Sequence, residues 1–261
     1  MAYQTIIFEK ENGIGIVKIN RPQAANALND LAYAELFQVF QEISQDKDLR
    51  AVIITGAGEK SFIAGTDITN MANLSAAEAR AFASSLKKTY DLIWNLDKPV
   101  IAAVNGYAFG GGSEIAMCAD IIIASENAKF GQLEINVGII PGSGGTQRLQ
   151  RLVGINRAKE LIYTGSIIDA KTAFNIGLVN KVVPQADLIK EAQAMIQKIL
   201  DYHSNAILKL AKSAINNGAN TDLDTGLNIE IECFAQCFAT EDQKEAMKAY
   251  LEKRKPVVKN K

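Results

Sequence analysis

Short apolar runs alternate with stretches of helical periodicity over the first two thirds of this chain. The runs at 5–8 and 14–19 are rich in β-branched residues, and Asn12-Gly13 between them favours a hairpin turn. Between residues 29 and 43, apolar side chains recur every three or four positions, which predicts an amphipathic helix. The chain is therefore expected to begin with two paired strands and a helix.

The same alternation continues toward the middle of the chain. Ser75-x-x-Glu78 is a capping box that opens a helix reaching Trp94, and Lys98-Pro99 ends it. From about Pro184 the strand patterns stop and four helical patterns follow, the last opened by Thr240-x-x-Gln243. The remaining predictions are strands at 51–55, 99–104, 121–124 and 178–183, and a helix at 169–176.

This order of elements predicts an α/β protein. An α/β core is expected over residues 1–190, followed by a helical C-terminal region over residues 191–261. Without a low-complexity linker, one core with an appendage is expected rather than two independent domains. Helices that have no strands of their own need a surface on which to bury their apolar faces, which indicates self-association.

Composition narrows the class of protein. The 261 residues are 48% hydrophobic and 22% charged, with a formal net charge of -1, which suits a globular protein with an ample core. A nearly neutral chain has no electrostatic reason to bind nucleic acid or a membrane surface, and no apolar run is long enough to cross a bilayer. Because the N-terminus lacks a basic or apolar leader, a cytoplasmic protein is expected.

Residue types that bind metals are scarce. His203 is the only histidine, which argues against a catalytic histidine triad or a His-rich zinc site. The three cysteines do not form an even disulfide framework, and Cys233 and Cys237 at i, i+4 of a helical pattern are expected to be buried thiols. We therefore expect no metal and no bound cofactor.

A glycine-rich stretch at 104–114 follows one predicted strand and precedes a helix expected at 114–119. Gly110, Gly111 and Gly112 carry no Cβ, so their backbone can approach a ligand and present N–H groups at a helix N-terminus. Glu114 follows at once, which would place a proton-transfer group beside oxyanion donors. Ordinary helix capping explains the same residues. The spacing matches neither the dinucleotide-binding fingerprint nor a P-loop.

A second glycine cluster, at 141–148, also precedes a helical pattern. It follows the segment 130–134, which ends in Glu134. The cluster is consistent with a ligand-binding turn and equally with a tight connection that binds nothing, and both interpretations stay open.

Six motifs together resemble those of the enoyl-CoA hydratase (crotonase) family. They occur in order through essentially the whole chain and are INRP at 19–22, IAGTDI at 63–68, AVNGYAFGGGSE at 103–114, FGQLE at 130–134, PGSGGTQRL at 141–149 and EKRK at 252–255. The resemblance implies a spiral of ββα units and a helical C-terminal region that mediates trimer formation. A homotrimer, or a homohexamer of two stacked trimers, is therefore expected.

The resemblance also implies a reaction. Glu114 and Glu134 match the two catalytic glutamates, and the backbone N–H groups of Ala64 and Gly111 match the oxyanion hole. Adding water to a double bond conjugated to a thioester needs a base for the water, an acid for the α-carbon and donors for the enolate-like oxygen. The implied activity is reversible syn addition of water to a trans-2-enoyl-CoA, giving a 3-hydroxyacyl-CoA, as in fatty acid β-oxidation. Short-chain, crotonyl-CoA-like substrates are expected.

Substrate contacts follow from the same resemblance. The segment of Ala64, Gly65, Thr66 and Asp67 would line the path of CoA, with Gly111 beside it. Tyr250 and Lys253 match a C-terminal region that touches the nucleotide end of CoA. Coenzyme A enters as part of the substrate, so no separate cofactor is implied.

Three departures from the family's pattern leave the acyl-chain preference open. Thr66 stands where Ala is common, Leu133 where Pro is common and Ala25 where Leu is common. Isomerases and hydrolases of the family share the oxyanion turn but usually lack one glutamate, so the presence of both favours hydration. A non-catalytic, RNA-associated member is a further alternative, which the neutral charge and the absence of a basic stripe disfavour.

Overall fold

The computed structural model describes residues 3–260, except for the side chain of Asn70. The described chain forms two compact units. One comprises the residues up to Leu96 together with Val100–Gln193, and the other comprises Asp97–Pro99 and the residues from Ala194 onward. This division falls close to the boundary expected near residue 190.

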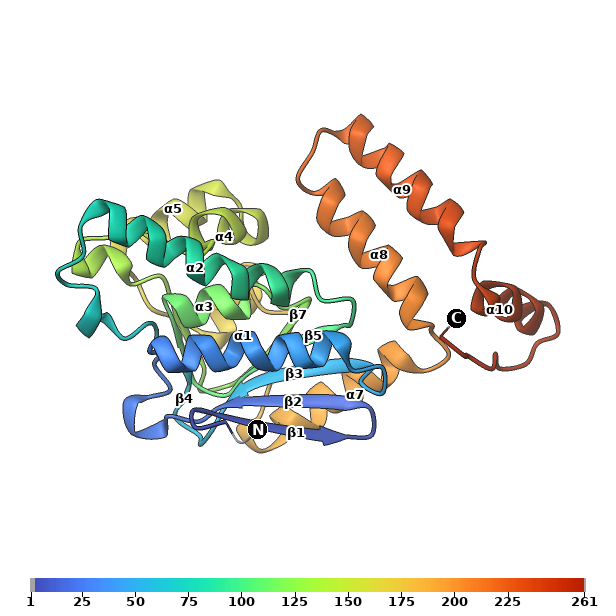
Figure 1. The fold of residues 1–261 in the computed structure, drawn as a ribbon, viewed down its shortest axis with the longest axis horizontal. Coiled ribbons are helices and arrows are strands. Elements are labelled where there is room, and N and C mark those ends of the chain that lie inside the picture. The colour runs from blue at the N-terminus through green and yellow to red at the C-terminus, as the bar shows by residue number, and fades with distance from the viewer. Residues whose placement is uncertain (1–2, 261) are drawn as a thin grey trace. The chain divides into compact units, whose positions relative to one another are not determined.

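Within residues 3–260, the strands form two sheets in the first unit (Figure 1). The larger sheet has the order β1-β2-β3-β5-β7-β10, and the smaller has the order β4-β6-β8-β9. The strands are β1 Ile6–Glu11, β2 Ile14–Ile19, β3 Ala51–Gly56, β4 Ser61–Ile63, β5 Val100–Val104, β6 Tyr107–Phe109, β7 Ile121–Ser125, β8 Lys129–Gly131, β9 Ile168–Asp169 and β10 Lys181–Val183.

From β3 to β8, consecutive strands alternate between the two sheets. Strand β3 lies in the larger sheet, β4 in the smaller, and a helix follows; β5, β6 and the next helix repeat this order, and β7 and β8 begin it again. The neighbours β2, β3, β5, β7 and β10 pair in parallel. This repeating β-β-α unit confirms the α/β class and the spiral that the resemblance implies.

Helices complete both units. In the first unit they are α1 Asp30–Gln45, α2 Ala76–Trp94, α3 Gly111–Ala116, α4 Gly145–Val153, α5 Ile155–Thr164 and α6 Ala170–Asn175. Helix α7 Leu188–Leu200 crosses the boundary, and α8 Asn205–Gly218, α9 Leu223–Cys237 and α10 Glu241–Leu251 follow. Short 3-10 turns lie at Pro22–Ala24 (η1), Ile68–Asn70 (η2), Glu134–Val137 (η3) and Gln185–Asp187 (η4).

Several local predictions are confirmed. Strands β1 and β2 form the antiparallel hairpin around Asn12-Gly13. Ser75 and Glu78 form a complete capping box at the start of α2. Strands β3 and β5 are buried along their whole length, as expected for parallel strands covered on both faces. Helix α1 buries Leu36, Phe40 and Ile43.

Other local predictions need correction. The glycine-rich stretch does not run directly from strand to helix, because β6 lies between β5 and α3 and pairs with β4 and β8. Helix α3 begins at Gly111, so Glu114 lies inside its first turn rather than at its start. Cys233 and Cys237 are half-buried rather than buried, and the Cys237 thiol donates to the Cys233 carbonyl at 3.3 Å.

The second unit is helical, as expected. Figure 1 shows α8 and α9 side by side, joined by a short connection. Asp222 caps α9 by accepting a hydrogen bond from the Thr225 amide. Thr240 caps α10 by accepting from the Gln243 amide, which confirms the second N-terminal signal read from the sequence.

Candidate active site

Glu114 is held by the second glycine cluster. Its side chain is only 3% exposed, and its Oε1 accepts hydrogen bonds from the amides of Ser143 (2.8 Å) and Gly145 (2.7 Å). Two backbone donors on one oxygen stabilise the ionised carboxylate and fix its direction. The turn before α4 is therefore more than a tight connection, because it orients Glu114.

Arg148 and Trp94 brace this turn. The Arg148 guanidinium donates to the carbonyl oxygen of Ser143 at 3.0 Å and lies 5.2 Å from the centre of the Trp94 ring. Gly144, which precedes α4, has a φ of 115°, a left-handed conformation that favours glycine. Arg148 also places a positive charge near Glu114, and this charge favours the carboxylate.

Glu134 approaches the glycine turn at 110–112 from a different strand. It opens the η3 turn shortly after β8, and β8 pairs with β6, which leads into Gly110. A Cβ placed on Gly110 would lie 3.0 Å from Glu134 Oε1, so this glycine leaves the space that the carboxylate uses. Glu134 Oε2 is buried and has no hydrogen-bond partner among the described residues.

The two carboxylates have unlike environments. Burial raises the pKa of Glu114, while its backbone donors and Arg148 oppose that rise. Burial raises the pKa of Glu134 to about 7, and the neighbouring charge of Glu114 adds to the rise. Near neutral pH, Glu134 can therefore hold or release a proton, whereas Glu114 has the donors that suit an anion.

Gly111 and Gly112 bring the turn against the smaller sheet. A Cβ on Gly112 would lie 2.1 Å from the Ile63 carbonyl oxygen, a distance that no side chain permits. The segment that follows Ile63 is therefore next to the start of α3. This contact places the predicted oxyanion segment, residues 64–67, beside Gly111.

The amide of Ala64 does not match its expected role as a donor to substrate. It donates to the Ala25 carbonyl at 3.1 Å, where Ala25 has a left-handed φ of 49°. Thr66 forms a parallel bridge with Leu28: the Leu28 amide donates to Gly65, and the Asp67 amide donates to Leu28. In such a bridge the amide of the middle residue points away from the partner. The Thr66 amide is therefore the better donor geometrically.

Tyr250 and Lys253 belong to the second unit. Tyr250 is 84% exposed near the end of α10, and Lys253 is exposed with a left-handed φ of 54°. Their predicted contact with the nucleotide end of CoA stays a prediction.

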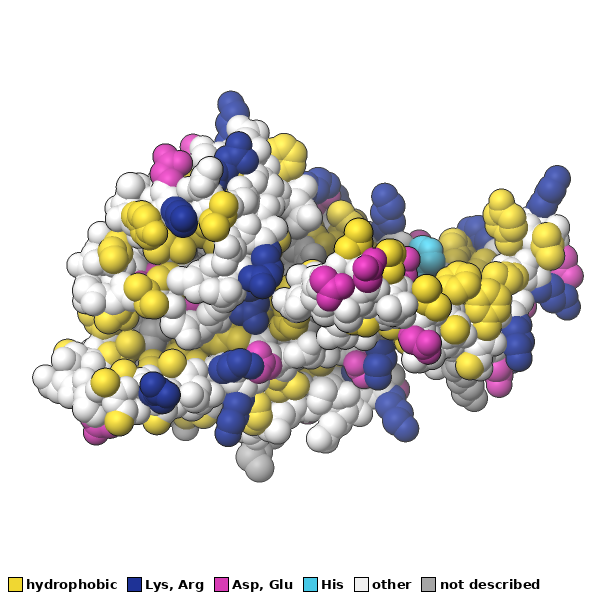
Figure 2. All heavy atoms as spheres, turned by 90° about the horizontal axis from the view of Figure 1, so that it is seen from above, with side chains coloured by type: hydrophobic (Ala, Val, Ile, Leu, Met, Phe, Trp, Pro, Cys, Tyr) yellow, Lys and Arg dark blue, Asp and Glu magenta, His cyan; other side chains and the backbone are white. Residues whose placement is uncertain are grey.

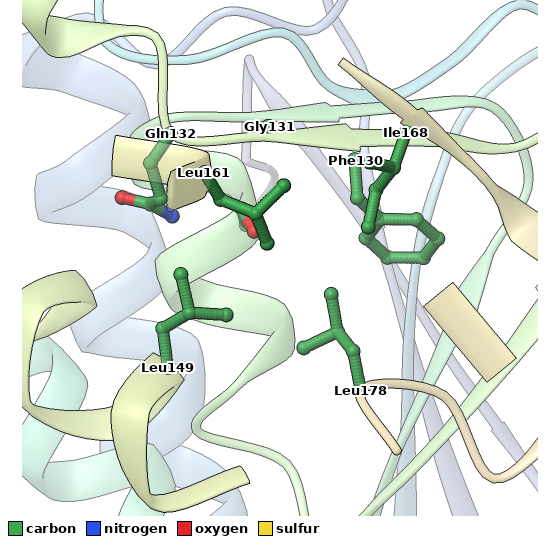
Figure 3. A pocket seen from close by; sticks show the side chains of 8 residues that line it. Phe130, Gly131, Gln132, Leu149, Leu161, Ile168 and Leu178 are labelled. Atoms are coloured by element: carbon green, nitrogen blue, oxygen red, sulfur yellow. The ribbon is translucent and has the colours of Figure 1, made fainter. Parts of the chain in front are cut away.

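A small cavity lies beside the site in the first unit (Figure 3). Its volume is about 10 Å³, room for about one water molecule and far too small for an acyl-CoA. Leu149, Leu161 and Leu178 point into it, and Gln132 borders it with an amide that has no partner among the described residues. The cavity therefore belongs to the core beside the candidate site.

Sequence reasoning missed the partners of Glu114 and two buried tyrosines. The amides of Ser143 and Gly145 carry no residue-type signal. Tyr33 and Tyr90 occupy helical positions that face the core, and the only signal that could have found them is that a buried phenol needs a hydrogen-bond partner.

Among residues 3–260, no helix has the length and apolarity to cross a membrane, and no cluster of three potential ligand side chains could hold a metal ion.

The whole chain matches a known family. The model of the enoyl-CoA hydratase/isomerase family matches residues 9–261, and the chain belongs to that family. It is 52% identical over 255 residues to the crotonyl-CoA hydratase of Syntrophomonas wolfei, covering 98% of each chain. It is 51% identical to the short-chain-enoyl-CoA hydratase of Clostridium acetobutylicum, covering 98% of this chain and 97% of that one.

Solved structures agree on the fold. The enoyl-CoA hydratase of Bacillus anthracis superposes with a TM-score of 0.93 at 40% identity, covering 99% of this chain and 100% of that chain. An enoyl-CoA hydratase subunit of Geobacillus kaustophilus superposes with a TM-score of 0.94 at 37% identity, covering 99% of both. The crotonase-type fold predicted from the sequence is therefore confirmed.

Proposed function

We propose that this protein is an enoyl-CoA hydratase that adds water reversibly to trans-2-enoyl-CoA and forms a 3-hydroxyacyl-CoA. The observation that carries the proposal is the pair of carboxylates, Glu114 and Glu134, beside one glycine turn. Their unlike environments suit a base and an acid in the same site. Family membership supports the reaction class.

In the proposed mechanism, the thioester oxygen accepts hydrogen bonds from the Gly111 amide and from a second amide in residues 64–67. Because the Ala64 amide is already bonded to Ala25, we assign this second donor to Thr66. Donors of this kind stabilise the charge that develops on the oxygen, and losing one typically costs roughly 3–4 kcal/mol of barrier.

The two glutamates then divide the proton transfers. The Glu114 carboxylate takes a proton from water as the water oxygen bonds to C3 of the substrate. The electron pair of the double bond moves toward the thioester and forms an enolate, and protonated Glu134 delivers its proton to C2. Both new bonds form on one face of the substrate if both carboxylates approach it from the same side, as the proposed syn addition requires. The reverse sequence dehydrates the product.

We further propose short-chain acyl groups as the substrates. The two relatives at 51–52% identity carry the names crotonyl-CoA hydratase and short-chain-enoyl-CoA hydratase. The test is purified protein assayed against trans-2-enoyl-CoAs of increasing length, with isomerisation of 3-enoyl-CoA and release of free CoA measured in parallel. We expect hydration to dominate with the highest kcat/KM on the shortest chains. Dominant isomerisation, dominant hydrolysis or salt-dependent RNA binding without hydration would refute the proposal.

We propose a homotrimer or homohexamer as the assembly. Within the second unit, α9 exposes Leu223 (77%), Ile231 (59%) and Phe234 (64%), and Figure 2 shows hydrophobic side chains gathered over the C-terminal helices. Exposed apolar surface of this kind marks an interaction site. Light scattering at micromolar concentration should give a trimer or hexamer, and a monomer would contradict the proposal.

We also propose a cytoplasmic location. The three cysteines are free thiols, which suits a reducing compartment. Fractionation of cells that express the protein would test this, and recovery of the protein outside the cytoplasm would refute it.

A further inference from the structure

Three hydroxyl groups lie together beneath the oxyanion turn. The Tyr33 hydroxyl is 2.7 Å from Thr66 Oγ1 and 3.4 Å from the Tyr90 hydroxyl. The Tyr90 hydroxyl donates to the Gly111 carbonyl at 3.1 Å. We call Tyr33, Thr66 and Tyr90 the hydroxyl cluster. It connects the two backbone segments that carry the proposed oxyanion donors.

Gly111 is surrounded by this cluster. A Cβ on Gly111 would lie 2.8 Å from Thr66 Oγ1, 3.0 Å from the Tyr33 hydroxyl and 3.2 Å from the Tyr90 hydroxyl. All three oxygens therefore face the same side of the Gly111 α-carbon. A glycine has no side chain to restrict its backbone, so these contacts set its position from outside.

The order of donors in the cluster follows from the bond to Gly111. Tyr90 has one hydroxyl proton, and the Gly111 carbonyl accepts it. In the 3.4 Å hydrogen bond between the two tyrosine hydroxyls, the donor must then be Tyr33. The two shorter contacts, at 2.7 and 3.1 Å, are therefore at the two ends of the cluster, one on each proposed oxyanion segment.

The tyrosines are rigidly placed and neutral. Tyr33 is 5% exposed on α1 and Tyr90 is 1% exposed on α2. Burial raises the pKa of Tyr33 to about 12, and the charges of Glu114 and Glu134 act in the same direction. Burial also raises the pKa of Tyr90, so both phenols keep their protons at neutral pH. Each ring is carried by a helix packed in the core.

We propose that Tyr33, Tyr90 and Thr66 are positioning residues that hold the Gly111 and Thr66 amides at the separation that the thioester oxygen requires. The proposal rests on the proposed hydratase function. Preorganised donors stabilise a developing oxyanion only when they need not rearrange during the reaction. The cluster supplies that rigidity by linking α1 and α2 to both segments.

The test compares hydroxyl deletions that keep the ring or the branched shape: Tyr33→Phe, Tyr90→Phe and Thr66→Val, with Thr66→Ser as the conservative variant. Tyr3→Phe is the matched control, because the Tyr3 hydroxyl bonds Glu42 at 3.3 Å on α1, outside the cluster. Each protein is assayed for kcat and KM with crotonyl-CoA and for thermal stability. Each is also titrated with acetoacetyl-CoA, whose enolate resembles the intermediate and has its own ultraviolet absorption.

We expect each hydroxyl deletion to lower kcat by about five- to tenfold, the scale of one neutral hydrogen bond, with KM changed by less than about twofold. Bound acetoacetyl-CoA should ionise at higher pH in the deletion variants, because a displaced donor stabilises its enolate less. Thr66→Ser should retain most activity, and Tyr3→Phe should match the wild type. The double variant Tyr33→Phe/Tyr90→Phe should lose less kcat than the product of the two single losses, because both hydroxyls act through Gly111.

Wild-type kcat and wild-type ionisation of acetoacetyl-CoA in Tyr33→Phe and Tyr90→Phe would overturn the proposal, even if both variants melted at lower temperature. If either tyrosine variant fails to fold, Thr66→Val against Thr66→Ser decides the question, because Thr66 is half-buried. Failure of the proposed function is a separate result, since it appears as a wild-type protein that hydrates no enoyl-CoA.

Discussion

Replacing Glu134 with glutamine should make the protein more stable at alkaline pH while removing most of its activity. Glu134 Oε2 is buried without a hydrogen-bond partner among the described residues, and burial raises the pKa of Glu134 from an ordinary value of 4.5 to about 7. Folding therefore favours the protonated acid. The contribution of Glu134 to stability is therefore fully present below pH 4.5 and is lost as the pH rises through about 7, where the folded protein must ionise Glu134. Glutamine does not ionise.

The size of the effect follows from the two pKa values. The gap between 4.5 and about 7 corresponds to roughly 3 kcal/mol if fully realised, at about 1.4 kcal/mol per pH unit. Glu134 is partly exposed, so solvent screening reduces this to about 1–2 kcal/mol. The stability advantage of Glu134→Gln should grow by that amount between pH 5 and pH 8. For a chain of this length, each kcal/mol corresponds to about 2–4 °C in Tm.

The assay is thermal unfolding of the wild type and Glu134→Gln at intervals from pH 5 to pH 8, with kcat measured on the same preparations. We expect kcat of the variant to fall by about 10²-fold or more, the usual scale for a positioned acid. Hydration by the wild type should weaken as the pH rises above 7, because protonated Glu134 is lost. Glu160→Gln, an exposed glutamate on α5, is the control. A pH-independent difference in Tm, or ordinary turnover by folded Glu134→Gln, would refute the reasoning.

Three further predictions follow from the same site. Glu114→Gln should lower kcat by about 10²-fold or more with little change in KM, and the double variant with Glu134→Gln should be scarcely worse than the poorer single variant; a lower Tm with normal kcat would instead make Glu114 a structural cap. Gly112→Ala should destabilise the protein by about 1–3 kcal/mol or more and abolish hydration, because its Cβ would meet the Ile63 carbonyl oxygen at 2.1 Å; normal Tm and activity would contradict this. Exhaustive dialysis against EDTA should leave activity unchanged, and recovery of lost activity with a divalent ion would reveal a required metal.

The parts of the fold that could be read from the sequence are those set by local chemistry. Asn12-Gly13 specifies a hairpin turn, Ser75 and Glu78 specify a helix start, and long apolar runs specify the buried parallel strands. Strand β6 was missed because its three residues have no pattern of their own and become a strand only by pairing with β4 and β8. Helix α5, directly after α4, was also not predicted.

The site shows the same limit. Glu114 and Glu134 could be named because the motifs contain them. The expectation for Ala64 failed in its geometry, because the direction of its amide depends on the left-handed turn at Ala25, far away in the sequence. The tyrosines of the hydroxyl cluster look like ordinary core residues of two amphipathic helices until the helices are packed.

Two chemically identical side chains therefore come to differ through the backbone around them. The Glu114 carboxylate accepts hydrogen bonds from two amides of a glycine turn, to which Arg148 also donates. The Glu134 carboxylate instead lies in a buried space that Gly110 leaves open. Replacing either glutamate with aspartate would shorten its side chain, but only at Glu114 would the change also break a pair of hydrogen bonds. In the proposed mechanism the division between base and acid is consequently a property of the turns, and a change at Arg148 should act directly on Glu114 and reach Glu134 only through the charge of Glu114.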